Sequence, residues 1–159
     1  MALEKGDIKS TYPLPSYNYR VTILHGAQAV VISFAEVSGL SLDYEPVTYK
    51  HGLSFLMGVH IIPGMPQPVR LTMKKGLVQG HDFLHRWIDS TYTVPLFPST
   101  QRDILIDLCD EAGQAVVRWT VQGALPVKWD APTFDANSND VAIETLELVA
   151  HGLQVDYHP

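Results

Sequence analysis

The sequence predicts a mainly β protein: a β-sandwich or barrel of about seven strands with one flanking α-helix. Three observations favour this class. Apolar and polar residues alternate with a period of two over most of the chain. Apolar residues at helical spacing occur in one segment only. The length of 159 residues, without an internal repeat, is typical of one domain. We therefore expect a single domain over residues 1–159, with residues 1–13 as an extended N-terminal arm.

Four segments alternate most clearly, at residues 16–23, 67–74, 103–109 and 114–122. Each puts mainly apolar side chains on one side and mainly polar side chains on the other, as a strand with one face in a core does. The residues Asp110–Gly113 between the last two segments suit a hairpin turn, because glycine adopts a positive φ without strain. The hairpin predicts that residues 103–109 and 114–122 are neighbouring antiparallel strands.

Three further segments complete the expected elements. Residues 29–37 form an almost continuous apolar run, which is typical of a strand covered on both faces. Residues 141–153 fit either a helix or a strand. We favour a strand with these residues on one face: Val141, Ile143, Thr145 and Val149. The single amphipathic helix is predicted over roughly residues 80–90. Its apolar side is formed by Phe83, Leu84, Trp87 and Ile88.

The composition limits the possible partners. Eleven Lys and Arg against 17 Asp and Glu give a formal charge of −6, so no excess of positive charge is present to bind phosphates, and nucleic acid is not expected as the primary ligand. Only 18% of the residues are charged and 46% are hydrophobic, which favours a protein with surface reserved for contacts with other copies. We therefore expect a protein that associates with itself.

No membrane span and no signal peptide are expected. The densest apolar stretch, residues 53–65, is too short to span a bilayer and contains His60 and Pro63. The first 16 residues lack the apolar core of a signal peptide, and the single cysteine, Cys109, excludes an internal disulfide framework. We therefore predict synthesis in the cytoplasm.

Catalytic and metal-binding patterns are incomplete. His81 and His85 have the i, i+4 spacing of zinc ligands on a helix, but Asp82 and not Glu follows the first histidine, and no third ligand is evident. Cys109 is a lone thiol on a predicted strand, where cysteine is usually a small apolar residue. The alternative from another functional class is a small β-barrel enzyme that uses His81, His85 and Cys109.

Two other kinds of site are also disfavoured. The chain has no glycine-rich phosphate loop, so we expect no nucleotide cofactor. The acidic pairs Asp43 with Glu45 and Glu144 with Glu147 are expected to be solvated or to face another subunit, because nothing beside them suggests a cleft. The prediction is a protein that is not an enzyme and needs neither cofactor nor metal.

Residues 53–65 form a distinctive apolar segment between two predicted strands, where loops are normally polar. An exposed apolar patch of this kind marks an interaction site. The alternative is that the segment folds back on its own core. We predict an arm that docks on a neighbouring copy through these residues: Leu53, Phe55, Leu56, Met57, Val59, Ile61, Ile62 and Met65.

Four blocks carry a family resemblance: Phe-Ala-Glu-Val-Ser-Gly-Leu at 34–40, Thr-Met-Lys-Lys-Gly at 72–76, Arg-Asp-Ile at 102–104, and Asn-Asp-Val-Ala-Ile-Glu-Thr-Leu-Glu-Leu at 139–148. In order and spacing they resemble the phage tail tube family, and more narrowly the inner tube protein of extracellular contractile injection systems. The resemblance extends over residues 13–153. The arm is more apolar than the family's hairpin, and residues 149–153 depart from its ending.

The resemblance implies six protomers in a ring, whose inner strands join into a continuous β-barrel around a channel. Rings would stack into a rigid tube inside a contractile sheath and carry protein cargo. The implied partners are other copies of the chain, the sheath, the baseplate or spike and the cap. The particle would be released outside the cell or docked to a membrane. An alternative that is nearer to this reading than an enzyme is the ring-forming tube and effector carrier of type VI secretion, which shares the fold.

Within such a ring, the polar side of the predicted hairpin is the candidate lining of the channel. Its other side is apolar and suited to the core, and a wet channel requires side chains that water can solvate. The predicted channel-lining residues are Asp103, Asp107, Gln114, Arg118, Thr120 and Gln122.

Overall fold

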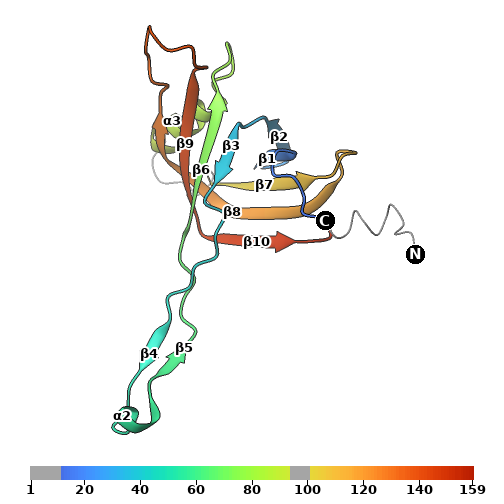
Figure 1. The fold of residues 1–159 in the computed structure, drawn as a ribbon. Coiled ribbons are helices and arrows are strands. Elements are labelled where there is room, and N and C mark those ends of the chain that lie inside the picture. The colour runs from blue at the N-terminus through green and yellow to red at the C-terminus, as the bar shows by residue number, and fades with distance from the viewer. Residues whose placement is uncertain (1–11, 94–100) are drawn as a thin grey trace, which may run out of the picture.

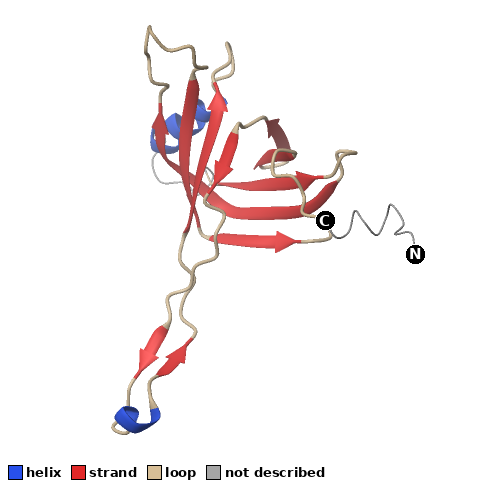
Figure 2. Ribbon diagram, in the orientation of Figure 1, coloured by secondary structure: helices blue, strands red, loops and turns tan. Residues whose placement is uncertain are grey.

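The computed structural model describes residues 12–93 and 101–159, and these form two packed sheets, one long arm and a helix against one side (Figure 1). The expected N-terminal arm at residues 1–13 lies almost wholly outside the described residues. The mainly β class is confirmed, and the strands in Figure 2 far outweigh the helices. The described chain has ten strands and not about seven, because three strands are only three residues long and the C-terminal segment forms two strands.

The strands are β1 (Tyr19–His25), β2 (Gln28–Ile32), β3 (Glu36–Ser38), β4 (Val47–Tyr49), β5 (His60–Ile62), β6 (Val69–Gly76), β7 (Arg102–Cys109), β8 (Ala115–Asp130), β9 (Ile143–Ala150) and β10 (Gly152–Asp156). The helices are α2 (Ser54–Met57) and α3 (Phe83–Thr93).

The sixteen-residue strand β8 belongs to both sheets. Its first half lies between β7 and β10, in a sheet of order β2-β1-β7-β8-β10, and its second half pairs with β9, followed by β6 and β3. All these pairs are antiparallel. The strand turns from one sheet to the other at Gly123, whose φ of +64° favours glycine and where a Cβ atom would collide with the ring of His151. We call the two layers the β7–β10 sheet and the β6–β9 sheet.

The core lies between these layers and is built from the alternating apolar faces that the sequence predicts. Val21 and Ile23 of β1, and Leu71 and Met73 of β6, are at most 1% exposed. The predicted turn at Asp110–Gly113 is confirmed, because the Asp110 amide donates to the Gln114 carbonyl at 2.9 Å and Gly113 has a φ of +79°. The helix α3 packs on β8 with Leu84 and Trp87 buried, and the Arg102 guanidinium lies 5.0 Å from the ring centroid of each of Phe83 and Trp87.

Two sequence predictions are wrong, one about residues 29–37 and one about Glu144. The run 29–37 is not one strand covered on both sides: β2 ends at Ile32, is the edge strand of the described sheet beside β1, and leaves Val31 61% exposed. The strand predicted within residues 141–153 is confirmed by β9, and the buried face of β9 carries Leu146, Leu148 and Ala150. Glu144 lies on this same face and is buried beside Lys75, with 3.4 Å between Nζ and Oε1. Burial of a paired charge is tolerated, and the expectation that Glu144 is solvated or faces a subunit is not met.

The arm leaves the body between β3 and β6 and extends well beyond it (Figure 1). Its base is held by backbone bonds from the Glu45 amide to the Met65 carbonyl at 3.2 Å and from the Gln67 amide to the Asp43 carbonyl at 2.7 Å. The antiparallel pair β4 and β5 continues it, and the short helix α2 closes the tip. Gly64 allows the two chains of the base to approach, because a Cβ atom there would overlap the carbonyl oxygen of Glu45.

Candidate assembly surfaces

A row of alternating charges crosses four strands on the outer face of the β7–β10 sheet. Arg20 of β1 is the register partner of Asp107 on β7, Asp107 is opposite Arg118 on β8, and Arg118 is opposite Asp156 on β10. Directly opposed residues of antiparallel strands share a face, so the four side chains lie side by side. We call these four residues the charge row.

The centre of the charge row is the buried carboxylate of Asp107, which is 2% exposed. Arg118 donates to it twice, from Nε to Oδ1 at 2.6 Å and from Nη2 to Oδ2 at 3.0 Å, and Arg20 donates from Nη2 to Oδ2 at 3.2 Å. The side chains of Arg20 and Arg118 remain 44% and 34% exposed. The carboxylate is therefore hidden, and the parts of the row that a neighbouring molecule would meet are guanidinium groups and Asp156.

The same contacts set the protonation of the row. The hydrogen bonds from Arg118, followed by those from Arg20, hold the pKa of Asp107 below its ordinary value of 3.8, although burial opposes them. The hydrogen bonds to Asp107 raise the pKa of Arg118, and the charge of Asp156 acts in the same direction. The central pair, Asp107 and Arg118, is thus ionised at neutral pH.

The other predicted channel residues lie around this row with less burial. Thr120 and Gln122 of β8 are half-buried, whereas Asp103 and Gln114 are exposed, and the Gly123 amide donates to Asp103 Oδ1 at 2.9 Å. Sequence reasoning missed Arg20 and Asp156 as members of the same face. The polar alternation of residues 16–23 already contained Arg20, but the partner strand could not be known without the sheet order.

The second candidate surface is the arm, where the predicted interface residues stand in solvent. Exposed fractions run from 45% at Val59 to 80% at Phe55 and Met65. The eight residues do not pack on the protomer's own core: Leu53, Phe55, Leu56, Met57, Val59, Ile61, Ile62 and Met65 are all exposed. A patch of this kind on a projecting element is typical of an interaction site.

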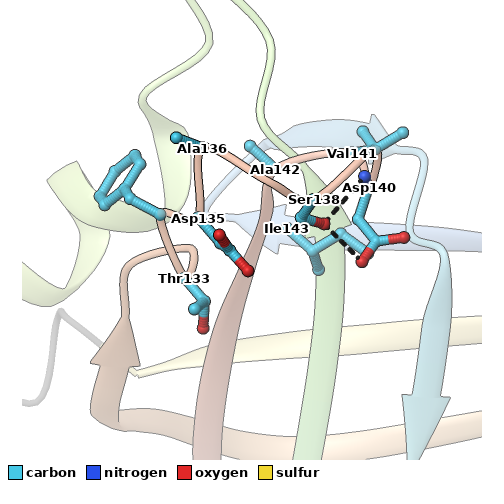
Figure 3. A pocket seen from close by; sticks show the side chains of 9 residues that line it. Thr133, Asp135, Ala136, Ser138, Asp140, Val141, Ala142 and Ile143 are labelled. Carbon is cyan, nitrogen blue, oxygen red and sulfur yellow. Dashed lines mark hydrogen bonds between the residues drawn. The ribbon is translucent and has the colours of Figure 1, made fainter.

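Figure 3 shows an open hollow of about 1080 Å³ in the loop between β8 and β9. Phe134, Val141 and Ile143 supply much of its apolar lining. Ser138 donates to the Asp140 carboxylate at 2.8 Å and its own Oγ accepts from the Asp140 amide at 3.1 Å, so the polar groups stabilise the loop itself. No histidine or cysteine is among the residues that line the hollow.

The three residues of the enzyme alternative are not assembled into one site. Cys109 is buried at the end of β7, where its register partner is Ala115 at the start of β8. His85 packs edge-on against Trp129, near the other end of β8, with 5.0 Å between the ring centroids. His81 lines a different hollow, beside β2. The reactive group that the enzyme alternative requires is therefore not formed by these three residues.

Within residues 12–93 and 101–159, no three His, Cys, Asp or Glu side chains are grouped so that they could hold a metal ion. In the same part of the chain, no helix is long and apolar enough to cross a membrane.

The chain matches a known protein family. Residues 15–154 match the family described as T4-like virus tail tube protein gp19. No curated protein sequence matches the chain.

Solved structures resemble the chain over nearly its full length. A chain of the PVC sheath-tube complex, an extracellular contractile injection system in the extended state, has 30% identity and a TM-score of 0.85, with 98% of this chain and 99% of that chain covered. A chain of the anti-feeding prophage cap has 30% identity and a TM-score of 0.79, with 99% of both covered. Hcp1 from Flavobacterium johnsoniae, at 15% identity, a TM-score of 0.53 and coverage of 87% and 95%, shares the fold.

Proposed function

The chain belongs to the family of T4-like virus tail tube proteins and is a tube protein of the contractile injection type, and we propose that six copies close into a ring and that rings stack into the inner tube. The exposed apolar arm is the observation that carries this proposal, because an isolated protomer leaves it without a partner. The whole chain would act as one domain, and its role would be mechanical and not catalytic.

The arm supplies the contact between protomers. Fully burying an apolar side chain is worth about 1.5–3 kcal/mol, and several such side chains outweigh the cost of ordering the arm on a partner. The arm and the surface that receives it are different parts of the protomer, so the contact is heterologous and forms a ring when its rotation closes. The residues Leu53, Phe55, Leu56, Met57, Val59, Ile61, Ile62 and Met65 are therefore proposed as the subunit interface.

The outer face of the β7–β10 sheet would line the channel. This face carries the predicted channel residues Asp103, Asp107, Gln114, Arg118, Thr120 and Gln122, and the charge row gives it a wet surface of mixed charge. Because the Asp107 carboxylate is buried, its contribution is to hold the two arginines and not to meet cargo. The proposed cargo is protein.

The remaining partners follow from the assembly. The tube would lie inside a sheath, begin at a baseplate and end at a cap, since the similar chains come from a sheath-tube complex and from a tube-terminating cap. We propose synthesis in the cytoplasm followed by assembly into an extracellular particle. The likeness to Hcp1 concerns the fold alone, so it does not favour a type VI secretion role.

The test is the double variant Phe55→Ser with Leu56→Ser, compared with Phe55→Leu with Leu56→Met, which keeps the tip apolar. We expect the serine variant to keep the wild-type circular dichroism spectrum and melting temperature but to sediment as a monomer. The conservative variant should form rings or tubes in negative-stain micrographs. A serine variant that melts at a much lower temperature as a monomer would place the arm in the protomer's own core and refute the proposal.

A further inference from the structure

The charge row contains two arginines on a face that would otherwise suit a polyanion. A guanidinium group is always ionised, and its planar set of donors matches a phosphate. Arg20 and Arg118 lie on strands that are both neighbours of β7, and each is more than one third exposed. In a ring, such a pair on every protomer would repeat around the channel. Cations repeated in this way bind nucleic acid by releasing its counterions.

Two carboxylates counter these arginines from fixed positions. Asp107 occupies Nε and Nη2 of Arg118 and Nη2 of Arg20, so donors that would hold a phosphate are already engaged. Asp156 faces Arg118 from the opposite neighbouring strand and attracts its charge. The formal charges of the four side chains sum to zero, and the fixed β-sheet register keeps each acid beside its arginine.

We propose that Asp107 and Asp156 determine the cargo specificity of the channel by neutralising Arg20 and Arg118, which excludes nucleic acid from this face. The inference rests on the proposed function, because it assumes that the charge row faces the channel. Burial of Asp107 is central to it: the carboxylate offsets one of the two arginine charges without itself presenting an anionic group that would repel or bind a protein cargo.

The experiment measures binding of a fluorescein-labelled thirty-nucleotide oligothymidylate by anisotropy, at several salt concentrations. The variants are Asp156→Asn, which changes an exposed carboxylate, and Asp107→Asn. The matched control is Asp135→Asn, which makes the same change of net charge in the exposed loop between β8 and β9. We expect about tenfold tighter binding for Asp107→Asn at low salt, a smaller gain for Asp156→Asn and none for the control.

A second comparison assigns the gain to the arginines. Adding Arg118→Gln to either row variant should remove most of the gain, and the slope of log affinity against log salt should fall with it. If Asp107→Asn does not fold, the affinity of Asp156→Asn for the oligothymidylate tests the inference by itself, because that carboxylate is exposed. Equal binding by the row variants and the control, or a gain that survives Arg118→Gln, would overturn the inference. Negative-stain micrographs of the same samples test the proposed function separately. A lack of tubes would contradict the proposed function, whereas the inference depends on the measured affinities for the oligonucleotide.

Discussion

Lys75 Nζ lies 3.4 Å from Glu144 Oε1 at the end of the core between the two sheets, and both residues are at most 9% exposed. They are register partners on β6 and β9, each at the position where its strand would otherwise carry the next apolar residue. The indole of Trp129 donates to the other oxygen of Glu144 at 3.0 Å. The carboxylate thus has a partner for each oxygen.

This pair predicts strong coupling between two substitutions. Lys75→Met alone leaves a buried carboxylate without its cation and should lower the free energy of unfolding by about 3–5 kcal/mol. The double variant Lys75→Met with Glu144→Met should recover most of that loss, because no buried charge remains. The free energy of unfolding is measured by urea denaturation. All variants also carry Phe55→Ser and Leu56→Ser, which are expected to keep the protein monomeric, so assembly does not interfere. Additive effects of the two substitutions would contradict the coupling.

The pKa of Asp107 predicts a specific dependence on acid. A lowered pKa in the folded state means that the carboxylate contributes stability above its ordinary value of 3.8, and that this contribution is lost as the pH falls through the folded pKa. Asp107→Asn should therefore be less stable than wild type by about 1–3 kcal/mol at pH 6, and the difference should shrink below pH 3.8. Denaturant titrations at several pH values check this, and an equal difference at every pH would show that the ionised carboxylate is not the cause.

The close approach at Gly64 predicts a defect of assembly without a defect of folding. In Gly64→Ala the added Cβ would overlap the Glu45 carbonyl, so the base of the arm must open and the tip must move. The body should melt at the wild-type temperature, while ring and tube formation should fall sharply. Gly52→Ala is the matched control, since open space surrounds that position in the same arm. Sedimentation of both variants decides, and normal assembly by Gly64→Ala would show that the arm's direction is unimportant.

The proposed channel lining predicts protection from a bulky thiol reagent. Thr120→Cys adds a half-buried thiol beside the charge row, and the native Cys109 is buried and should react slowly. Labelling at position 120 should be fast in the monomer and strongly slowed in tubes that are enclosed by a sheath and capped. Equally fast labelling in both samples would show that this face does not line the channel.

Those features are predicted correctly in which a residue's neighbours follow from the chain itself. The alternation at Val21 and Ile23, the turn at Gly113 and the helix around Trp87 depend on local geometry, and the structure confirms them. The burial of Glu144 could not be predicted, because the sequence pattern around it does not show that Lys75 lies opposite, nearly seventy positions earlier. The charge row could not be predicted for the same reason. Arg20 and Asp107 are 87 positions apart in the sequence, and the order of the strands in the sheet brings them together.

The shared strand β8 has a mechanical consequence for a tube that is driven forward by its sheath. A load applied to the β6–β9 sheet would reach the proposed channel wall along one covalent backbone, through the bend at Gly123. The chain from β9 to β10 makes a second crossing at His151, whose amide donates to the Gln122 carbonyl beside that bend at 3.2 Å. Sliding the two layers past each other would therefore require deforming two peptide chains, and not only separating packed side chains, so a protomer under thrust should move as a rigid body.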